Sequence, residues 1–412
     1  MFSSILPTIW NILQVYYLSL KVYETKNQKF YKDHKAFSII VAEKGEEKEV
    51  IDGLIKNLLS IDYDEYEIIV VSDDPYESFR RKYSEYEGIK KLRIVNRDDP
   101  KGKKAGALNY AIKLAQNPYL VFLDADARVE KDFLKKLTEY EFEILSLRIK
   151  IYNAETWVQK YYMYFTEKVM DSLFRARTHL GLPIFPNGSA LSIKKEILLE
   201  IGGWREGLIT EDLELGIRAF IKGHRIEYAD DILVFSLAPY TLTDLYSQIE
   251  RWSYGSAQLF LESIKMLKNG IKGLEGFIYS QQWGIYGLYI LVLSTLSALD
   301  FLLKIPIMWY FISFLIYGFS LVIYSLKFNA KITNTKLPIT ILNASISGYI
   351  KGLLKIPLIW KVTPKVKEVT EENEKISFLV PLLLLLSFIN IIQGEILSAA
   401  ILLLLGIMEA AV

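Results

Sequence analysis

Two aspartates separated by one residue follow an apolar run at residues 121–123, Val-Phe-Leu. Asp124 and Asp126 stand where a strand should end, and a turn there would let both carboxylates face one cleft. Hard cations such as Mg²⁺ and Mn²⁺ prefer such oxygen ligands, usually one or two carboxylates completed by substrate phosphates. An Asp-rich turn without a metal explains the same two residues, so the pair alone leaves both interpretations open.

A second apolar run, residues 67–71, ends in the same way, with Asp73 and Asp74 after it. A turn, favoured by Pro75, is again the structural alternative. Ligands of parallel sheets sit at the carboxyl ends of the strands. Two acidic strand ends in one sheet therefore favour a shared binding edge.

A basic, glycine-containing segment at residues 101–109 runs into a predicted helix. Lysines and free backbone N–H groups at a helix N-terminus suit phosphate. The spacing is not that of a P-loop, and an ordinary helix start explains the segment equally well.

Thr210, Glu211 and Asp212 precede an amphipathic stretch. In the structural interpretation, Thr210 caps a helix and the two acids favour its positive end. In the functional interpretation, one of the carboxylates is a general base that takes a proton from an acceptor hydroxyl.

Gln248, Arg251 and Trp252 share one face of a predicted helix, because they are three and four positions apart. A guanidinium beside an indole could hold a diphosphate and a sugar ring. Alternatively, the indole anchors the helix at the level of the lipid headgroups. The basic segment 360–365 is, on its own, a juxtamembrane loop.

The elements that must position these residues alternate between short apolar runs and amphipathic stretches. Strands are predicted at 37–41, 67–71, 92–95 and 119–123, and helices at 50–59 and 105–115. Alternation of this kind predicts a mostly parallel sheet flanked by helices, an α/β fold.

Hydropathy separates a charged body from apolar flanks. The chain is 51% hydrophobic and 24% charged, but most long apolar runs fall at residues 5–20 and after Trp283. The first run either spans the membrane or lies at its interface. Further spans are predicted near 283–303, 305–326, 376–392 and 396–408, which gives a multi-pass protein of the cell membrane with about five spans.

Domain boundaries follow from this division. We expect an N-terminal membrane helix at 1–30, a catalytic domain at 31–240, interfacial helices at 241–282 and a C-terminal transmembrane region at 283–412. The lysine-rich segment 327–375 should face the cytoplasm, and the catalytic domain with it.

Composition excludes several kinds of site. The chain has no cysteine, so disulfides and thiolate metal sites are excluded. His34, His179 and His224 lack ligand spacing, which argues against a histidine metal site or a Ser-His-Asp triad. A net charge of +1 gives no general attraction to nucleic acid, and none is expected as a partner.

As a set, and in this order, the motifs resemble those of membrane-integrated, inverting family 2 glycosyltransferases of the cellulose-synthase-like and hyaluronan-synthase-like kind. The resemblance covers residues 37 to about 260 and extends more loosely to 365. The matching residues are Glu46-Glu47, Asp73-Asp74, Lys104 to Asn109, Asp124 with Asp126, Gly202-Gly203-Trp204, Thr210-Glu211-Asp212 and Gln248 to Trp252.

The resemblance implies a GT-A fold and a role for each match. Donor contacts would come from Glu46, Asp73, Lys104 and Asp124, with Gln248, Arg251 and Trp252 on the diphosphate and the acceptor end. Asp126, with Asp124, would bind Mg²⁺ or Mn²⁺. Asp212 would be the general base, with Glu211 and Asp124 beside it in the catalytic set. Residues 362–365 resemble a gating loop that closes over bound nucleotide, with Thr363 and Lys365 as substrate contacts.

The implied activity is metal-dependent, inverting transfer of a sugar from a nucleotide sugar, here a UDP-sugar, to a growing β-linked polysaccharide. The alternative acceptor is a membrane lipid, such as a polyprenyl phosphate, a ceramide-like lipid or a glycerolipid, because the chain has fewer spans than larger polymer synthases. A non-catalytic membrane scaffold is disfavoured, since Asp126, Asp212 and Arg251 are all present. The loops at 41–47 and 72–75 depart from the family pattern, so the base and the sugar stay open.

Overall fold

The four predicted strands lie side by side in an eight-stranded sheet of order β3-β2-β1-β4-β7-β6-β8-β5. The structure is a computed structural model that describes residues 2–20, 34–329, 336–358 and 379–410. The strands are β1 (Phe37–Glu43), β2 (Tyr66–Ser72), β3 (Leu92–Asn96), β4 (Tyr119–Leu123), β5 (Arg128–Val129), β6 (Ile144–Ile151), β7 (Ala190–Lys194) and β8 (Ile226–Ser236).

Strands β1 to β4 run parallel to one another, as the sequence predicts. Strand β7 is antiparallel to both β4 and β6, and β5 is antiparallel to β8. The sheet is therefore mixed rather than uniformly parallel. Its parallel half carries the predicted acidic strand ends.

Both faces of the sheet are buried, which explains why the strands are continuous apolar runs. In β1, Ile39 and Val41 belong to one core and Ile40 to the other. The flanking helices are α2 (Lys48–Leu59), α3 (Tyr76–Tyr83), α4 (Lys103–Leu114), α5 (Phe133–Thr138), α8 (Lys195–Ile201) and α9 (Glu211–Lys222). Helices α2 and α5 supply the first core, and α4, α8 and α9 supply the second.

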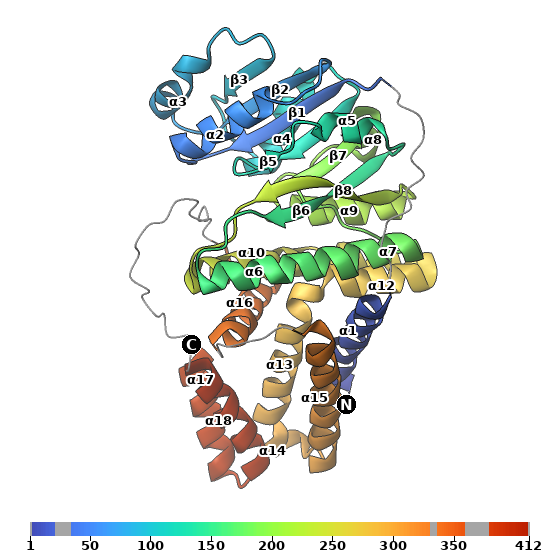
Figure 1. The fold of residues 1–412 in the computed structure, drawn as a ribbon. Coiled ribbons are helices and arrows are strands. Elements are labelled where there is room, and N and C mark those ends of the chain that lie inside the picture. The colour runs from blue at the N-terminus through green and yellow to red at the C-terminus, as the bar shows by residue number, and fades with distance from the viewer. Residues whose placement is uncertain (1, 21–33, 330–335, 359–378, 411–412) are drawn as a thin grey trace.

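A layer of helices crosses the molecule beneath the sheet (Figure 1). It contains α6 (Trp157–Val169), α7 (Arg175–Leu180), α10 (Leu242–Gln258), α11 (Phe260–Ile264) and α12 (Gly270–Ser280). A π-helical turn, Met170–Phe174, joins α6 to α7. Thr156 and Thr241 start α6 and α10 with capping boxes, which fixes where each helix begins.

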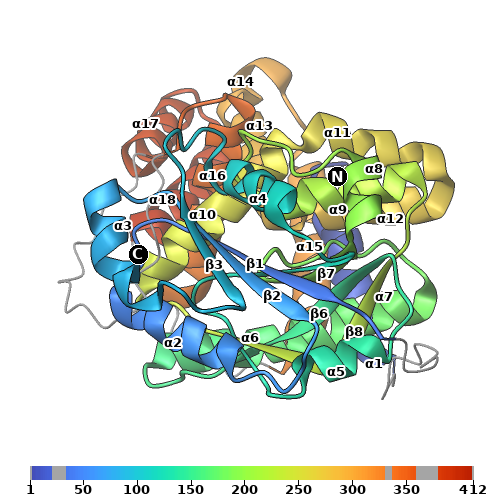
Figure 2. The same ribbon diagram turned by 90° about the horizontal axis from the view of Figure 1, so that it is seen from above.

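The remaining helices form a bundle on the far side of this layer from the sheet (Figure 1). Seen from above, much of the bundle extends beyond one edge of the sheet (Figure 2). They are α1 (Phe2–Ser19), α13 (Gln282–Ala298), α14 (Asp300–Leu303), α15 (Ile307–Phe328), α16 (Lys336–Leu353), α17 (Leu379–Ile392) and α18 (Ile396–Ala410). The described parts of the predicted apolar segments are thus mostly helical.

Length and composition single out one helix of the described chain as able to cross a membrane, Met308–Phe328. The apolar part of α17, Leu383–Ile392, is shorter. Large apolar side chains are nevertheless exposed along the bundle, among them Phe319, Leu326, Phe388, Ile392, Ile396 and Leu404. The prediction of about five spans therefore stays a prediction, supported in the described part by one helix of full length.

Candidate active site

Lys104 brings three of the predicted motifs together. It lies in the first turn of α4, which begins at Lys103 directly after Gly102. Both of those residues have left-handed backbone conformations. Its Nζ donates to Asp124 Oδ1 at 2.7 Å and lies 3.4 Å from Glu211 Oε1. The basic helix start, the end of β4 and the start of α9 thus meet at one ammonium group.

Burial and charge act in opposite directions on these groups. Burial alone would lower the pKa of Lys104, but Asp124, Glu211 and Asp212 together raise that pKa, so the ammonium stays charged. Burial raises the pKa of Glu211 to about 7; Lys104 opposes this shift and Asp212 adds to it. Glu211 can therefore exchange a proton near neutral pH.

The carboxylate of Asp212 is oriented by two backbone donors. Gly188 N donates to Oδ2 at 2.9 Å, and Leu213 N donates to Oδ1 at 2.8 Å. A Cβ at residue 188 would lie 3.1 Å from Oδ2, so glycine allows this close approach. A carboxylate held at a helix N-terminus in this way suits a general base.

Thr210 does not act as the predicted cap of this helix. Its side chain makes no capping hydrogen bond, and its buried Oγ1 has no partner among the described residues. A Cβ at Gly255 of α10 would fall 2.2 Å from that oxygen. Thr210 is therefore a packing contact that seats α10 against the start of α9.

Asp126, in the turn between β4 and β5, is buried against the end of β8, with 2% of its surface exposed. Its Oδ2 accepts hydrogen bonds from Ser236 Oγ and Leu237 N, both at 3.1 Å. These donors fix the orientation of the carboxylate. Together with Asp124, two residues away, it supplies the hard oxygen donors that Mg²⁺ or Mn²⁺ prefers.

No group of three or more His, Cys, Asp or Glu residues able to hold a metal occurs in the described part of the chain. A metal held only by protein side chains is therefore not indicated there. The donor set fits a cation that takes one or two carboxylates and completes its shell with phosphate oxygens and water.

Tyr162 of α6 connects Asp126 with the Gln248 and Arg251 motif. Burial raises the pKa of Tyr162 well above its ordinary value, Gln248 and Arg251 lower it, and Asp126 raises it. These groups therefore lie within electrostatic reach of one another. The sequence analysis missed Tyr162, because α6 carries no motif of its own.

The predicted face of α10 is divided between two environments. Trp252 packs on Trp283 of α13, with ring centroids 4.7 Å apart, in an apolar cluster. The buried Oε1 of Gln248 has no hydrogen-bond partner among the described residues. Trp252 thus packs against α13, and its contact with the acceptor end stays a prediction. Gln248 retains an unused acceptor beside Tyr162.

Asp73 is paired with an arginine that the sequence analysis did not single out. Arg97 Nε donates to Asp73 Oδ1 at 2.6 Å, and the second nitrogen donates to Oδ2 at 2.5 Å. The same guanidinium donates to the carbonyl oxygens of Lys101 and Lys103. Asp73 therefore anchors the loop that presents Lys104, and its contact with the donor stays a prediction.

The loop after β1 is tied to the end of β2 through Asp74. Gly45 N donates to Asp74 Oδ1 at 2.6 Å, and Lys82 pairs with the other oxygen. Lys82 also lies 3.4 Å from Glu43, a carboxyl whose pKa burial raises. Glu46 is partly buried in the same loop, and its role stays a prediction. Thr363 and Lys365 lie outside the described residues.

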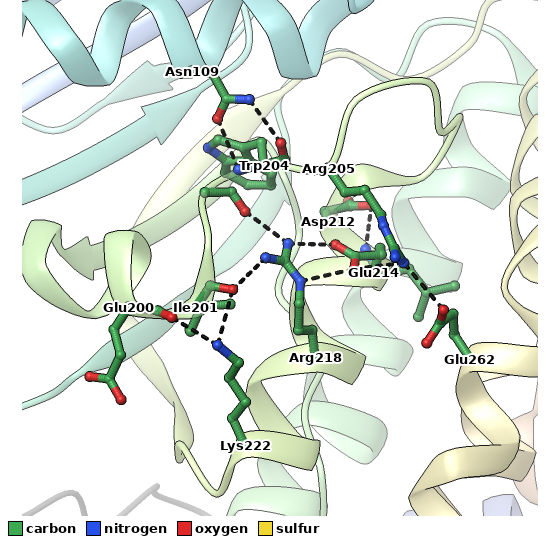
Figure 3. Close-up of polar contacts among 12 residues, drawn as sticks. Asn109, Glu200, Ile201, Trp204, Arg205, Asp212, Glu214, Arg218, Lys222 and Glu262 are labelled. Carbon is green, nitrogen blue, oxygen red and sulfur yellow. Dashed lines mark hydrogen bonds and ion pairs between the residues drawn. The ribbon is translucent and has the colours of Figure 1, made fainter.

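A polar clamp joins Asn109 at the end of its motif to Trp204 (Figure 3). Asn109 Nδ2 donates to Trp204 O at 2.8 Å, and Trp204 N donates to Asn109 Oδ1 at 2.9 Å. Arg218 of α9 binds Glu214 and the carbonyl oxygens of Ile201 and Gly203. The Gly202-Gly203-Trp204 segment is thus held between α4 and α9, the helix that carries Asp212.

Comparison with known proteins agrees with this architecture. Residues 119–328, about half of the chain, match the family model described as glycosyl transferase family group 2. Residues 38–191 match that of glycosyl transferase family 2. In structure, the chain is similar to a mannosyltransferase of Pyrobaculum calidifontis in complex with GDP-Man and Mn²⁺, with a TM-score of 0.52, 17% identity and coverage of 85% of this chain and 99% of the other.

Two curated relatives extend the similarity. A probable glycosyltransferase of Sulfolobus acidocaldarius is 27% identical over 390 residues, 87% of this chain and 84% of the relative. The poly-β-1,6-N-acetyl-D-glucosamine synthase of Staphylococcus aureus is 25% identical over 253 residues, 60% of this chain and 61% of the relative. The predicted membership of family 2 and its GT-A-like α/β fold are therefore confirmed, and the cellulose-synthase-like or hyaluronan-synthase-like subtype stays a prediction: this chain belongs to glycosyl transferase family group 2.

Proposed function

We propose that this protein is a membrane-embedded, inverting glycosyltransferase that transfers a sugar from a UDP-sugar to a growing β-linked polysaccharide. The observation that carries the proposal is the convergence of Asp124 and Glu211 on Lys104, with Asp212 beside them at the start of α9. An ion-pair network that only stabilises the fold would not require the Asp212 carboxylate to be oriented by two backbone N–H groups. It would also not require a lysine at a position where it could bind a diphosphate.

The reaction would be a single displacement at the anomeric carbon. Asp212 takes the proton of the acceptor hydroxyl while its oxygen forms the new bond to that carbon. The bond from the carbon to the diphosphate oxygen breaks, and the nucleoside diphosphate leaves. Lys104 and Arg251 supply positive charge for the leaving group. The configuration at the carbon inverts, so an α-linked donor gives a β-linked product.

Asp126 and Asp124 would hold the divalent cation. When bound, Mg²⁺ or Mn²⁺ would neutralise negative charge on the departing diphosphate. The hydrogen bonds of Asp126 to Ser236 and Leu237 keep its carboxylate oriented before the donor arrives. Asp73 and Glu46 would contact the nucleoside, and Gln248 would meet the diphosphate or acceptor end.

The polymer acceptor is supported by the printed activity of the Staphylococcus aureus relative, a polysaccharide synthase. The membrane position is supported by the helix Met308–Phe328 and by the exposed apolar side chains of α15, α17 and α18. We propose that the catalytic domain is on the cytoplasmic side, because the sequence of residues 327–375 is rich in lysine.

Product analysis tests the proposal. Purified protein in nanodiscs is given Mg²⁺ or Mn²⁺, native lipid extract and a panel of radiolabelled UDP- and GDP-sugars. We expect high-molecular-weight product that one β-specific glycosidase degrades. Label confined to organic-extractable lipid would replace the polymer by a lipid acceptor, and absence of transfer from every donor would favour a scaffold.

Asp212→Asn tests the base within the same assay. The variant should lose turnover and keep donor binding, because the amide retains the shape of the side chain but cannot accept the proton. Asp171→Asn is the matched control: Asp171 is an ion-paired aspartate 2.9 Å from Arg148, outside the site. Turnover at the wild-type rate in Asp212→Asn would reject Asp212 as the base.

A further inference from the structure

A fully buried arginine lies beneath the site, on α7. Arg177 is 0% exposed. Its Nε donates to the carbonyl oxygen of Pro183 at 2.7 Å, and its two other nitrogens pair with both oxygens of Glu275 on α12. The guanidinium also stacks on Tyr279, 3.8 Å from the ring centroid.

A buried ion pair is weak evidence for stability, because desolvation offsets the attraction. What this pair fixes is the relative position of the groups that it joins. Those groups are α7, α12 and the backbone of Pro183, the second residue of the segment 182–189. The segment runs from the end of α7 toward β7.

Residues 182–189 lead directly to the proposed base. Arg177 binds the segment near its start, at Pro183 O, and Gly188 near its end donates to Asp212. Between them, Phe185 stacks on Tyr279, with centroids 4.8 Å apart and planes 12° apart. A Cβ at Gly216 of α9 would fall 2.8 Å from the Phe185 ring, so the segment also packs closely against α9.

The N-terminal helix α1 joins the same network. Tyr17 donates from its hydroxyl to Glu275 Oε1 at 2.7 Å and is 1% exposed. Trp10, two turns earlier, stacks on Tyr279 at 6.0 Å. A predicted membrane helix therefore contacts both the carboxylate that pairs with Arg177 and the ring on which Arg177 stacks.

We propose that Arg177 is a positioning residue for Asp212, and that Tyr17 of α1 supports it through Glu275. Arg177 holds the start of residues 182–189, and that segment presents the Gly188 N–H that orients the Asp212 carboxylate. This inference rests on the proposed role of Asp212 as general base. It adds that α1 is needed for the geometry of the base and not only for attachment to the membrane.

The test separates kcat from the donor KM. Lysine at position 177 keeps the charge but not the planar fork that binds Glu275 and Pro183 O together. Because small displacements of a reacting group slow chemistry steeply, we expect Arg177→Lys to lower kcat by about tenfold or more and to leave the donor KM within about twofold. Tyr17→Phe removes one hydroxyl and should lower kcat by about threefold, again without a change in KM.

The matched control is Arg175→Lys, two positions away on α7. Arg175 pairs with Asp230 and lies 3.3 Å from Asp171, two aspartates outside residues 182–189. Its variant should keep the wild-type kcat. A folded Arg177→Lys protein with the kcat of Arg175→Lys would overturn the inference. If Arg177→Lys does not fold, an unchanged kcat in Tyr17→Phe would overturn it instead.

The proposed function fails in a different way. Absence of transfer by the wild-type protein, or full turnover by Asp212→Asn, would reject the reaction or the base, and this inference with it. Wild-type transfer that Asp212→Asn abolishes, together with an unaffected Arg177→Lys, would reject only the positioning role.

Discussion

Lys104 Nζ lies 2.7 Å from Asp124 Oδ1, and this ion pair joins the start of α4 to the end of β4. Glu211 Oε1 lies 3.4 Å from the same ammonium. The charge of the lysine therefore offsets the repulsion between the two carboxylates.

Lys104→Met should lower kcat by about 100-fold, the usual effect of losing one preorganised charge at a leaving group. Lys104→Arg keeps the charge with a different shape, and we expect a loss of about tenfold. Initial rates with saturating donor and acceptor measure both. Lys101→Met is the control, because Lys101 is 85% exposed and pairs only with Asp99 among its described salt bridges. Equal rates for Lys104→Met and Lys101→Met would remove Lys104 from the mechanism.

Asp126→Asn should abolish the metal dependence of donor binding. The amide preserves the size of the side chain but is a far weaker ligand for a hard cation. Calorimetric titration with UDP, with and without Mn²⁺, measures the effect. Wild-type binding should tighten with Mn²⁺, and binding to the variant should not change. Asp62→Asn, at an exposed aspartate paired with Lys135, should behave as wild type. Retained Mn²⁺ dependence in Asp126→Asn would reject it as a ligand.

The strands and the binding edge could be predicted because their signals are local. The four predicted strands are β1, β2, β3 and β4. The bounds of β4 agree fully, and those of the other three differ by one or two residues. Asp73 and Asp124 follow parallel strands, so topology alone brings them to one edge. Strands β5 to β8 were not predicted. The reversed direction of β7 could not be read from its composition, because direction depends on how the chain crosses the sheet.

The partners of the site residues could not be predicted. Arg97 binds Asp73, and Lys82 binds Asp74 and Glu43. The sequence around a charged residue does not indicate which distant residue it will pair with. Tyr162 and Arg177 lie on helices without motifs and reach the site only through tertiary packing. Thr210 was predicted to cap a helix with its side chain, and this was wrong. The side chain packs against Gly255 instead, a tertiary contact that the local sequence does not indicate.

Asn109→Ala should lower both stability and activity. Two hydrogen bonds to the Trp204 backbone would be lost, 2.8 and 2.9 Å long, and a loss of about 1–3 kcal/mol is typical when backbone groups lose their partners. Because Trp204 precedes the segment that leads to Glu211 and Asp212, we also expect kcat to fall by about tenfold. Thermal melting and initial rates measure the two effects.

Asn57→Ala is the matched control for Asn109. Asn57 makes the same double clamp on the backbone of Val129, at 2.9 and 2.8 Å, on the side of the sheet opposite to α4. Its variant should lose similar stability and keep kcat. If both variants lose kcat equally, the Asn109 clamp acts only through stability.

Glu211→Gln should change the dependence of stability on pH. Burial raises the pKa of Glu211 to about 7 in the folded protein, whereas an unfolded glutamate titrates near about 4.3. The folded state therefore favours the protonated form. Its contribution to stability is fully present below about pH 4.3 and is lost as pH rises toward 7, by at most about 4 kcal/mol.

Glutamine mimics the protonated carboxyl at every pH. The melting temperature of Glu211→Gln should therefore match that of the wild type near pH 5 within a few degrees and exceed it at pH 8. Melting in detergent at intervals between pH 5 and 8 measures this difference. Glu87→Gln, at an exposed glutamate outside the site, should give a flat difference. A flat or falling difference for Glu211→Gln would mean that Lys104 holds Glu211 ionised in the folded protein, and the site would then carry a permanent negative charge opposite the donor.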